Sequence, residues 1–253
     1  MCRAQPGGSG PGVLERRDPL NVLLFGATGM IGSGALLECL DHPDVAHVRS
    51  VSRRPSGKTH AKLEELVHDD FLDYSSVVGR FEDCDACLFC LGVSAAGMSE
   101  DDYRRITRDF TIAAADALRS VRPDATFCYI SAAGADPEQK SRMMWARVRG
   151  GLEKELLERG DAPTWIFRPG YIQPAKGVTS RTTLYNLAYA VAGPLFPLLD
   201  RFAADHVTTT ERLGLALIRA ARDGAPKTHL ENRDINALAK GERSAVVGRA
   251  LPG

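Results

Sequence analysis

The stretch Asn21-Val-Leu-Leu-Phe25-Gly26-Ala-Thr-Gly29-Met-Ile-Gly32 decides the fold. Its first five residues are typical of a buried strand, and the glycine-rich remainder turns sharply into a helix. Glycines allow a tight turn and a close approach to a pyrophosphate, while the helix N-terminus offers unpaired N–H donors. The stretch therefore predicts a dinucleotide-phosphate site. Its expected residues are Gly26, Thr28, Gly29, Met30, Ile31 and Gly32.

Apolar strands and amphipathic helices alternate after this stretch. Because several of the apolar runs are continuous, they indicate strands covered on both faces. This alternation predicts right-handed βαβ units and an α/β fold with a doubly wound parallel sheet. The expected strands are Asn21–Phe25, His47–Val51, Glu65–His68, Ala86–Leu91, Thr126–Ser131 and Thr164–Phe167. The expected helices are Met30–Leu40, Asp102–Ser120, Lys140–Arg159, Thr182–Ala192 and Thr209–Arg222.

Three parts of the chain differ in composition and in residue pattern. Residues 1–18 are rich in Gly, Pro and Arg and are expected to form a flexible tail. Residues 19–170 carry the strand–helix alternation and the nucleotide site. Residues 171–253 read as mainly helical, and a length of roughly 80 residues is small for an independent core. We expect this last part to pack on the substrate side as a lid within one structural unit.

Composition excludes several classes of protein. The chain has 253 residues, 44% of them hydrophobic and 25% charged, as in soluble globular proteins. Its 32 basic and 32 acidic residues balance, which gives no electrostatic reason to expect a nucleic-acid partner. Cys84, Cys87 and Cys90 share one apolar run and are interpreted as core residues, so no metal site is expected. The absence of a signal peptide and these cysteines favour a cytoplasmic protein.

The uncharged stretch Thr182–Leu199 calls for a membrane test. Its Pro194 and Pro197 prevent a regular helix over the last third, so a membrane span is not expected. A buried helix is the simplest account. A peripheral membrane contact and a homodimer face stay open as alternatives.

The end of the second expected strand indicates which dinucleotide binds. An NAD site places a carboxylate about 20 residues after the glycines. Here Ser52 occupies that place, and Arg53 and Arg54 follow it. Guanidinium groups suit a 2′-phosphate through charge-assisted, often bidentate hydrogen bonds. Ser52, Arg53 and Arg54 therefore favour NADP(H) over NAD(H).

These residues together resemble the atypical branch of the short-chain dehydrogenase/reductase superfamily. The glycine spacing, Arg53-Arg54 and the motifs after later strands look most like its Tat-interacting, oxidoreductase-like, NADP-binding group. The resemblance covers about residues 20–175 and implies a Rossmann fold with the cofactor along the carboxyl ends of the strands. It places Asp70 and Phe71 near the adenine, and Arg168, Pro169 and Gly170 near the nicotinamide. Leu91 and Gly92 follow the fourth strand and complete the implied cofactor site.

The catalytic pair of that superfamily, Tyr-x-x-x-Lys, is replaced in this chain. Trp145 stands at the tyrosine position and Arg149 at the lysine position. Indole does not titrate in the useful range, whereas arginine still donates to ribose hydroxyls but is no proton relay. The resemblance also makes Ser131 a candidate catalytic serine. Loss of a general acid costs about 10²–10⁴-fold in rate without preventing cofactor binding.

Two functions are consistent with these residues. The first is an NADP(H)-dependent oxidoreductase acting on an unknown small carbonyl compound near Ser131, Trp145 and Arg149. Its candidate proton donors are Tyr171 and Tyr129. The alternative is a catalytically degenerate NADP(H)-binding protein that acts as a regulator or sensor. Fold analogy does not decide between them.

Overall fold

Seven parallel strands form the central sheet of the computed structural model, which describes residues 18–160, 162–178, 196, 203 and 205–242. The strand order is β3-β2-β1-β4-β5-β6-β9. The strands are β1 (Leu20–Phe25), β2 (Val45–Ser52), β3 (Leu63–Val67), β4 (Ala86–Phe89), β5 (Thr126–Ile130), β6 (Thr164–Arg168) and β9 (His229–Glu231). A separate parallel pair consists of β7 (Tyr171–Gln173) and β8 (Val207–Thr209).

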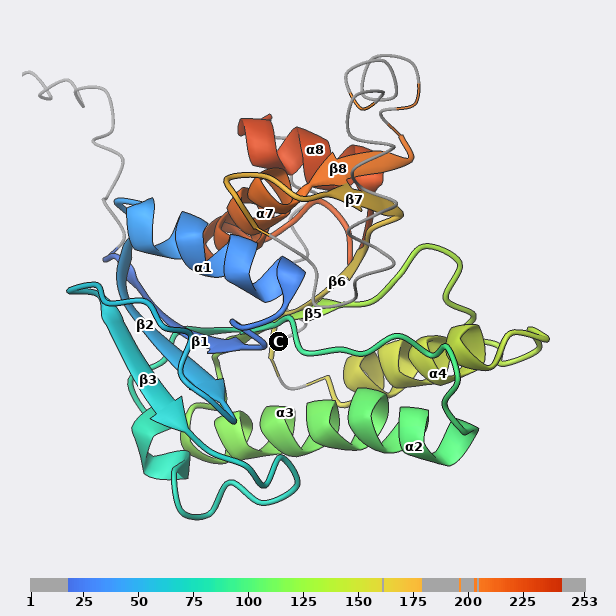
Figure 1. The fold of residues 1–253 in the computed structure, drawn as a ribbon, viewed down its shortest axis with the longest axis horizontal. Helices are drawn as coiled ribbons and strands as arrows, with labels where there is room; N and C mark the ends of the chain where they lie inside the picture. The colour runs from blue at the N-terminus through green and yellow to red at the C-terminus, as the bar shows by residue number, and fades with distance from the viewer. Residues whose placement is uncertain (1–17, 161, 179–195, 197–202, 204, 243–253) are drawn as a thin grey trace, which may run out of the picture.

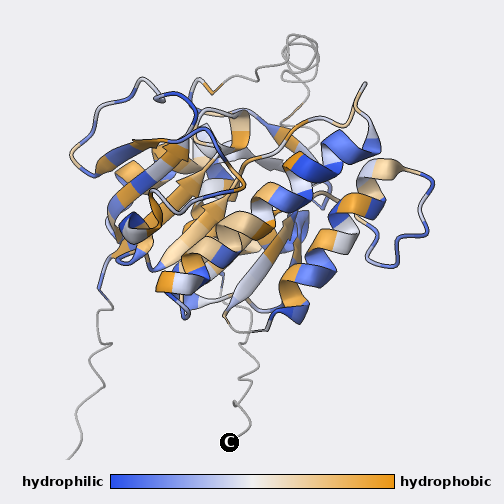
Figure 2. Ribbon diagram, turned by 90° about the horizontal axis from the view of Figure 1, so that it is seen from below, coloured by the Kyte–Doolittle hydropathy of each residue, from blue (hydrophilic) through white to orange (hydrophobic). Residues whose placement is uncertain are grey.

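Helices cover both faces of this sheet (Figure 1). One face carries α1 (Met30–Asp41), α7 (Thr210–Asp223) and α8 (Asn232–Lys240). The other carries α2 (Glu100–Arg104), a π-helical turn η2 (Arg105–Asp109), α3 (Phe110–Val121), α4 (Met144–Glu158) and the 3₁₀ turn η1 (Val78–Phe81). Seen from the α3 side, the strands are orange and hydrophobic behind helices that carry both blue and orange residues (Figure 2). The predicted doubly wound sheet is therefore confirmed.

The inner strands are buried on both faces, as their continuous apolar runs predicted. Every residue of β4 and β5 is buried. The strand order reverses between β2 and β4, on either side of β1. In doubly wound sheets this reversal opens a crevice at the carboxyl ends of the strands, where ligands bind. The glycine-rich stretch follows β1 and so lies at that crevice.

Residues beyond 170 contribute more strand than the sequence indicated. They supply β9, which pairs with β6, and the pair β7 and β8. Each of these strands has only three residues, too few for a periodic pattern. The expected helix Thr209–Arg222 is present as α7, whereas Thr182–Ala192 lies outside the described residues. The division at residue 170 stays a prediction.

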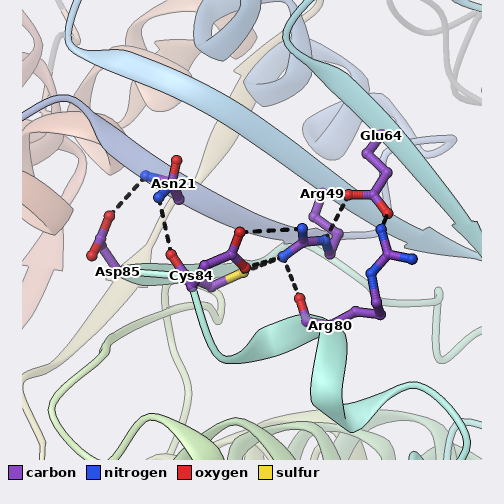
Figure 3. A network of polar contacts seen from close by, with 7 residues as sticks. Asn21, Arg49, Glu64, Arg80, Cys84 and Asp85 are labelled. Atoms are coloured by element: carbon purple, nitrogen blue, oxygen red, sulfur yellow. Dashed lines mark hydrogen bonds and ion pairs between the residues drawn. The ribbon is translucent and has the colours of Figure 1, made fainter.

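Charged side chains fasten the amino-terminal edge of the sheet, at the opposite end from the crevice. Arg49 of β2 donates to Glu64 of β3 at 2.9 Å, to Asp83 and to the carbonyl of Arg80 (Figure 3). Arg80 also pairs with Glu64. The Cys84 thiol is buried against Arg49, 3.4 Å from Nη1, and burial raises its pKa to about 11. This network joins η1 to β2 and β3.

The described part of the chain has neither a membrane-spanning helix nor a metal-binding cluster of side chains. Within it, no helix has both the length and the apolar character needed to cross a bilayer. In the same residues, no group of three His, Cys, Asp or Glu side chains gathers as a metal site would. The stretch Thr182–Leu199 falls almost wholly outside the described residues. The described cysteines Cys39, Cys84, Cys87, Cys90 and Cys128 are free and buried.

Candidate functional site

Close backbone contacts shape the turn between β1 and α1. Gly26 has φ +82°, and a Cβ on Gly32 would lie 2.1 Å from the carbonyl oxygen of Gly26. The Gly29 N–H closes the turn on that same oxygen at 2.8 Å. Gly29 caps α1 without a side-chain hydrogen bond, and the first turn of the helix has no acidic residue. A backbone cradle at the positive end of a helix suits a pyrophosphate.

The carboxyl end of β2 presents two arginines beside this turn. Arg53 and Arg54 are both exposed, and no ion pair joins either to another described residue. Ser52 is buried, and its hydroxyl donates to the carbonyl oxygen of Arg54 at 2.6 Å. The serine therefore fixes the loop, and binding of a phosphate by the two guanidinium groups stays a prediction.

The loop after β3 holds the residues that the resemblance placed near the adenine. Asp70 is exposed, and its Oδ1 accepts from the Leu72 N–H at 3.0 Å. Phe71 is 4% exposed and stacks on Phe110 with 5.5 Å between ring centroids. Its ring is therefore a core group in this structure, and Asp70 is the more accessible of the two.

Arg149 lies deep at the carboxyl ends of β4 and β5. Its Nε donates to the Tyr103 hydroxyl at 2.9 Å, and its Nη1 donates to the carbonyl oxygen of Ile130 at 3.0 Å. The Tyr129 hydroxyl lies 3.5 Å from Nη1. A Cβ built on Gly92 would lie 3.6 Å from Nη2, so Arg149 reaches the loop after β4 that also contains the half-buried Leu91. Arg149 is thus held in one orientation beside the expected cofactor loop.

Trp145 lies one helical turn before Arg149 on α4. Its indole approaches the loop after β5, where a Cβ on Gly134 would lie 3.5 Å from the ring. The side chain is half-buried. Trp145 therefore lies against the loop after β5, and its part in the site stays a prediction.

The Ser131 side chain is buried between the end of β5 and α4. It is 4% exposed, and its hydroxyl donates to Glu153 of α4, which is completely buried. Glu153 also binds Arg168, whose Nε lies 3.1 Å from each carboxylate oxygen. Glu153 was not among the site residues predicted from the sequence. Its position four residues after Arg149, on the same helical face, was the signal that could have found it.

Backbone contacts fix the turn formed by Arg168, Pro169 and Gly170. The Ala133 N–H donates to the carbonyl oxygen of Pro169 at 3.0 Å, and the Gly170 N–H donates to Asn232 Oδ1 at 3.3 Å. The turn therefore lies between the loop after β5 and the start of α8. It follows β6 directly and opens on the same edge of the sheet as the glycine turn.

The two candidate tyrosines differ in accessibility. Tyr129 is 1% exposed, and burial raises the pKa of its phenol to about 12, which makes it a poor proton donor. Tyr171 is half-buried, donates to Gln173 Oε1 at 2.7 Å and contacts the ring of Phe196. Burial also raises the pKa of Tyr171, so it is protonated at neutral pH.

The order of the strands separates these groups into two ends of one crevice. Arg53 and Arg54 follow β2 on one side of the glycine turn, whereas Arg149 and the Arg168–Gly170 turn lie by β4, β5 and β6 on the other. A dinucleotide spans such a crevice with its pyrophosphate at the first helix. The arrangement defines a nucleotide-cofactor site.

A protein-family model described as NAD(P)H-binding matches residues 26–186. Since this is more than half of the chain, the protein belongs to that NAD(P)H-binding family. The assignment to the Tat-interacting group is not confirmed. NAD(P)H binding is shared by the whole family, so the choice of NADP is a separate question.

Several curated proteins and solved structures are similar to this chain. A protein of Aspergillus terreus named "Protein fmp52-1, mitochondrial" is 32% identical over 158 residues, or 60% of this chain. The match spans 66% of that relative, just under two thirds of its length. The Bordetella bronchiseptica enzyme WbmF, solved with NAD+, has a TM-score of 0.64 at 13% identity and covers 90% of this chain and 81% of its own. A short chain dehydrogenase family protein from Francisella tularensis has a TM-score of 0.59 at 13% identity and covers 81% and 92%.

The expectation of a cytoplasmic protein is wrong. Relatives from several Aspergillus species and from Emericella nidulans are named as mitochondrial proteins, which conflicts with it. The prediction depended on two expectations from the sequence: that the cysteines are reduced core residues and that the chain carries no secretory signal. Free cysteines report a reducing environment rather than one compartment.

Proposed function

We propose that the protein is an NADP(H)-dependent oxidoreductase that acts on a small carbonyl compound. The observation that carries the choice of NADP(H) is the exposed pair Arg53 and Arg54, which no described residue neutralises, at the end of β2. A 2′-phosphate carries two negative charges, and the planar guanidinium group of arginine binds it through paired N–H donors. A carboxylate in the same place would instead favour the unphosphorylated ribose.

The residues present fit such a cofactor. Gly26 and Gly32 pack directly against backbone atoms, since a Cβ on Gly32 would lie 2.1 Å from the Gly26 oxygen, and this packing shapes the turn into α1, whose first N–H groups would receive the pyrophosphate. Arg149 would donate to the nicotinamide ribose, as the superfamily lysine does, because it keeps its charge at every physiological pH. When bound, the nicotinamide supplies the hydride for carbonyl reduction.

Three other residues have proposed roles around the reacting centre. Trp145 would close one side of the substrate site and exclude water. Tyr171 would donate the proton, since it is protonated and lies just past the Arg168–Gly170 turn. Ser131 supports the floor of the site through Glu153 rather than through substrate contact.

Oxidation of NADPH against a panel of aldehydes, ketones and quinones tests the proposal. We expect turnover in the wild type, with a loss of about 10²-fold or more in Tyr171→Phe. Tyr129→Phe is the matched control, because its buried phenol is a poor acid and should leave the rate nearly unchanged. Turnover that is the same in Tyr171→Phe as in the wild type would remove Tyr171 from the mechanism.

One observation favours the alternative, a cofactor-binding regulator without turnover. The hydroxyls of Ser131, Tyr129 and Tyr171 all have internal partners, and Trp145 supplies no titratable group. Two results together would support the regulatory function: wild type binds NADPH but reduces no compound of the panel, and Trp145→Tyr with Arg149→Lys creates turnover.

A further inference from the structure

Glu153 is a buried carboxylate that joins three strands to one helix. Its side chain is 0% exposed. It accepts from the Ser131 hydroxyl at the end of β5 and pairs with Arg168 at the end of β6. The Nε2 atom of His229 in β9 lies 3.6 Å from its Oε2. Residues of the last three strands of the sheet, or directly after one of them, therefore converge on this one side chain.

Arg168 compensates the buried charge of Glu153. An uncompensated buried carboxylate is costly, so Glu153 requires a cation with good geometry. Arg168 provides it through two nitrogens, and its Nη1 lies 3.5 Å from Glu231. The hydrogen bonds that Arg168 donates to Glu153 raise the pKa of Arg168, while burial and the nearby Arg168 lower the pKa of His229. Arg168 and Glu153 thus form the ion pair, with a neutral imidazole beside them.

The same helix contacts consecutive residues at the end of β5. Trp145, Arg149 and Glu153 are spaced four residues apart and so lie on one face of α4. Arg149 binds the carbonyl of Ile130, and Glu153 binds the hydroxyl of the next residue, Ser131. A displacement of the Glu153 contacts would therefore also displace Arg149 relative to β5.

We propose that Glu153 is a positioning residue that sets the geometry of the nicotinamide half of the cofactor site. This inference rests on the proposed NADP(H) function. Glu153 holds Arg168, which begins the Arg168–Gly170 turn, at a fixed distance from Arg149 on the same helix. It acts through these two arginines and needs no contact of its own with the cofactor.

Comparison of two ligands separates this role from a general effect on folding. NADPH spans both halves of the site, whereas adenosine 2′,5′-bisphosphate fills only the half near Arg53 and Arg54. In Glu153→Gln the neutral amide loses the ionic contact with Arg168. We expect calorimetry to show NADPH affinity reduced about tenfold or more, and bisphosphate affinity changed less than about twofold.

Glu38→Gln is the matched control. Glu38 of α1 is also buried, at 5% exposed, and pairs with Lys176 at 2.7 Å, but it faces α7 and not the crevice. Its substitution should lower the free energy of unfolding while the ratio of the two affinities stays at the wild-type value. Both variants thus remove one paired buried carboxylate, and only one of them lies at the nicotinamide half.

Three outcomes would overturn the inference. In Glu153→Gln, NADPH affinity equal to wild type would do so, as would an equal loss for both ligands. If that variant does not fold, Glu153→Asp decides, since it keeps the charge and shortens the reach by one methylene. An unchanged affinity ratio in Glu153→Asp would then reject the role, and a selective loss of NADPH would support it. Wild type that binds neither ligand would instead reject the proposed function itself.

Discussion

Removal of both guanidinium groups at the end of β2 should remove the preference for NADPH over NADH. Arg53→Ala with Arg54→Ala deletes two exposed cations that no described residue pairs with, so no internal ion pair is broken. A hydrogen bond to a charged group contributes about 1.5–3 kcal/mol, and exposure places each of these at the low end. The two together give about 3 kcal/mol, or roughly 100-fold in NADPH affinity.

NADH lacks the phosphate and should lose less than about threefold, since the same cradle at Gly26 and Gly32 receives its pyrophosphate. Calorimetry of both coenzymes at two salt concentrations measures this, because screening weakens only the phosphate contacts. A control with Arg105→Ala and Lys154→Ala removes two exposed charges on the helices below the sheet and should change neither affinity. Equal losses of NADPH and NADH in the Arg53 and Arg54 variant would refute the phosphate assignment.

Three further changes test other parts of the structure. Gly32→Ala places a Cβ 2.1 Å from the Gly26 oxygen and should abolish binding of both coenzymes, whereas Gly79→Ala, where a Cβ meets open space, should not. Normal binding of both coenzymes to Gly32→Ala in calorimetry would contradict the role of this turn. Tyr103→Phe removes the acceptor of Arg149 Nε and should lower the free energy of unfolding in urea by about 1–2 kcal/mol, with no change if that bond is absent in solution. Asp83→Asn should destabilise by less than about 1 kcal/mol near neutral pH, because the pair with Arg49 is partly exposed. Since the hydrogen bond from Arg49 lowers the pKa of Asp83 below 3.8, its contribution is complete above that pH and is lost as the pH falls through the lower, folded-state pKa. The difference in free energy of unfolding between wild type and Asp83→Asn should therefore become smaller at acid pH. A difference that does not change with pH would show that the charge of Asp83 is not involved.

The elements that the sequence predicted well are those with local signals. Continuous apolar runs predicted the buried strands β4 and β5, and the glycine spacing predicted the turn between β1 and α1. The strand β9 escaped notice because three residues after a proline carry no periodicity, and its place beside β6 follows only from the tertiary fold.

The candidate site was predicted less completely than the fold. Arg53 and Arg54 could be placed by counting from the glycines, since the loop is local. Glu153 could not, because a charged residue on an amphipathic helix is usually solvated, and its burial depends on Ser131 and Arg168 arriving from two other strands. Phe71 is buried and stacks on Phe110, and its place near the adenine stays a prediction.

The contact between α4 and the loop after β5 has a consequence for engineering. A Cβ on Gly150 would lie 1.9 Å from the backbone of Asp136, so the helix cannot shift or rotate there. One residue inserted between Trp145 and Gly150 would turn the indole by about 100° about the helix axis relative to this fixed point. New chemistry is therefore best introduced by exchanging side chains at positions 145 and 149, and every insertion or deletion between them should be avoided.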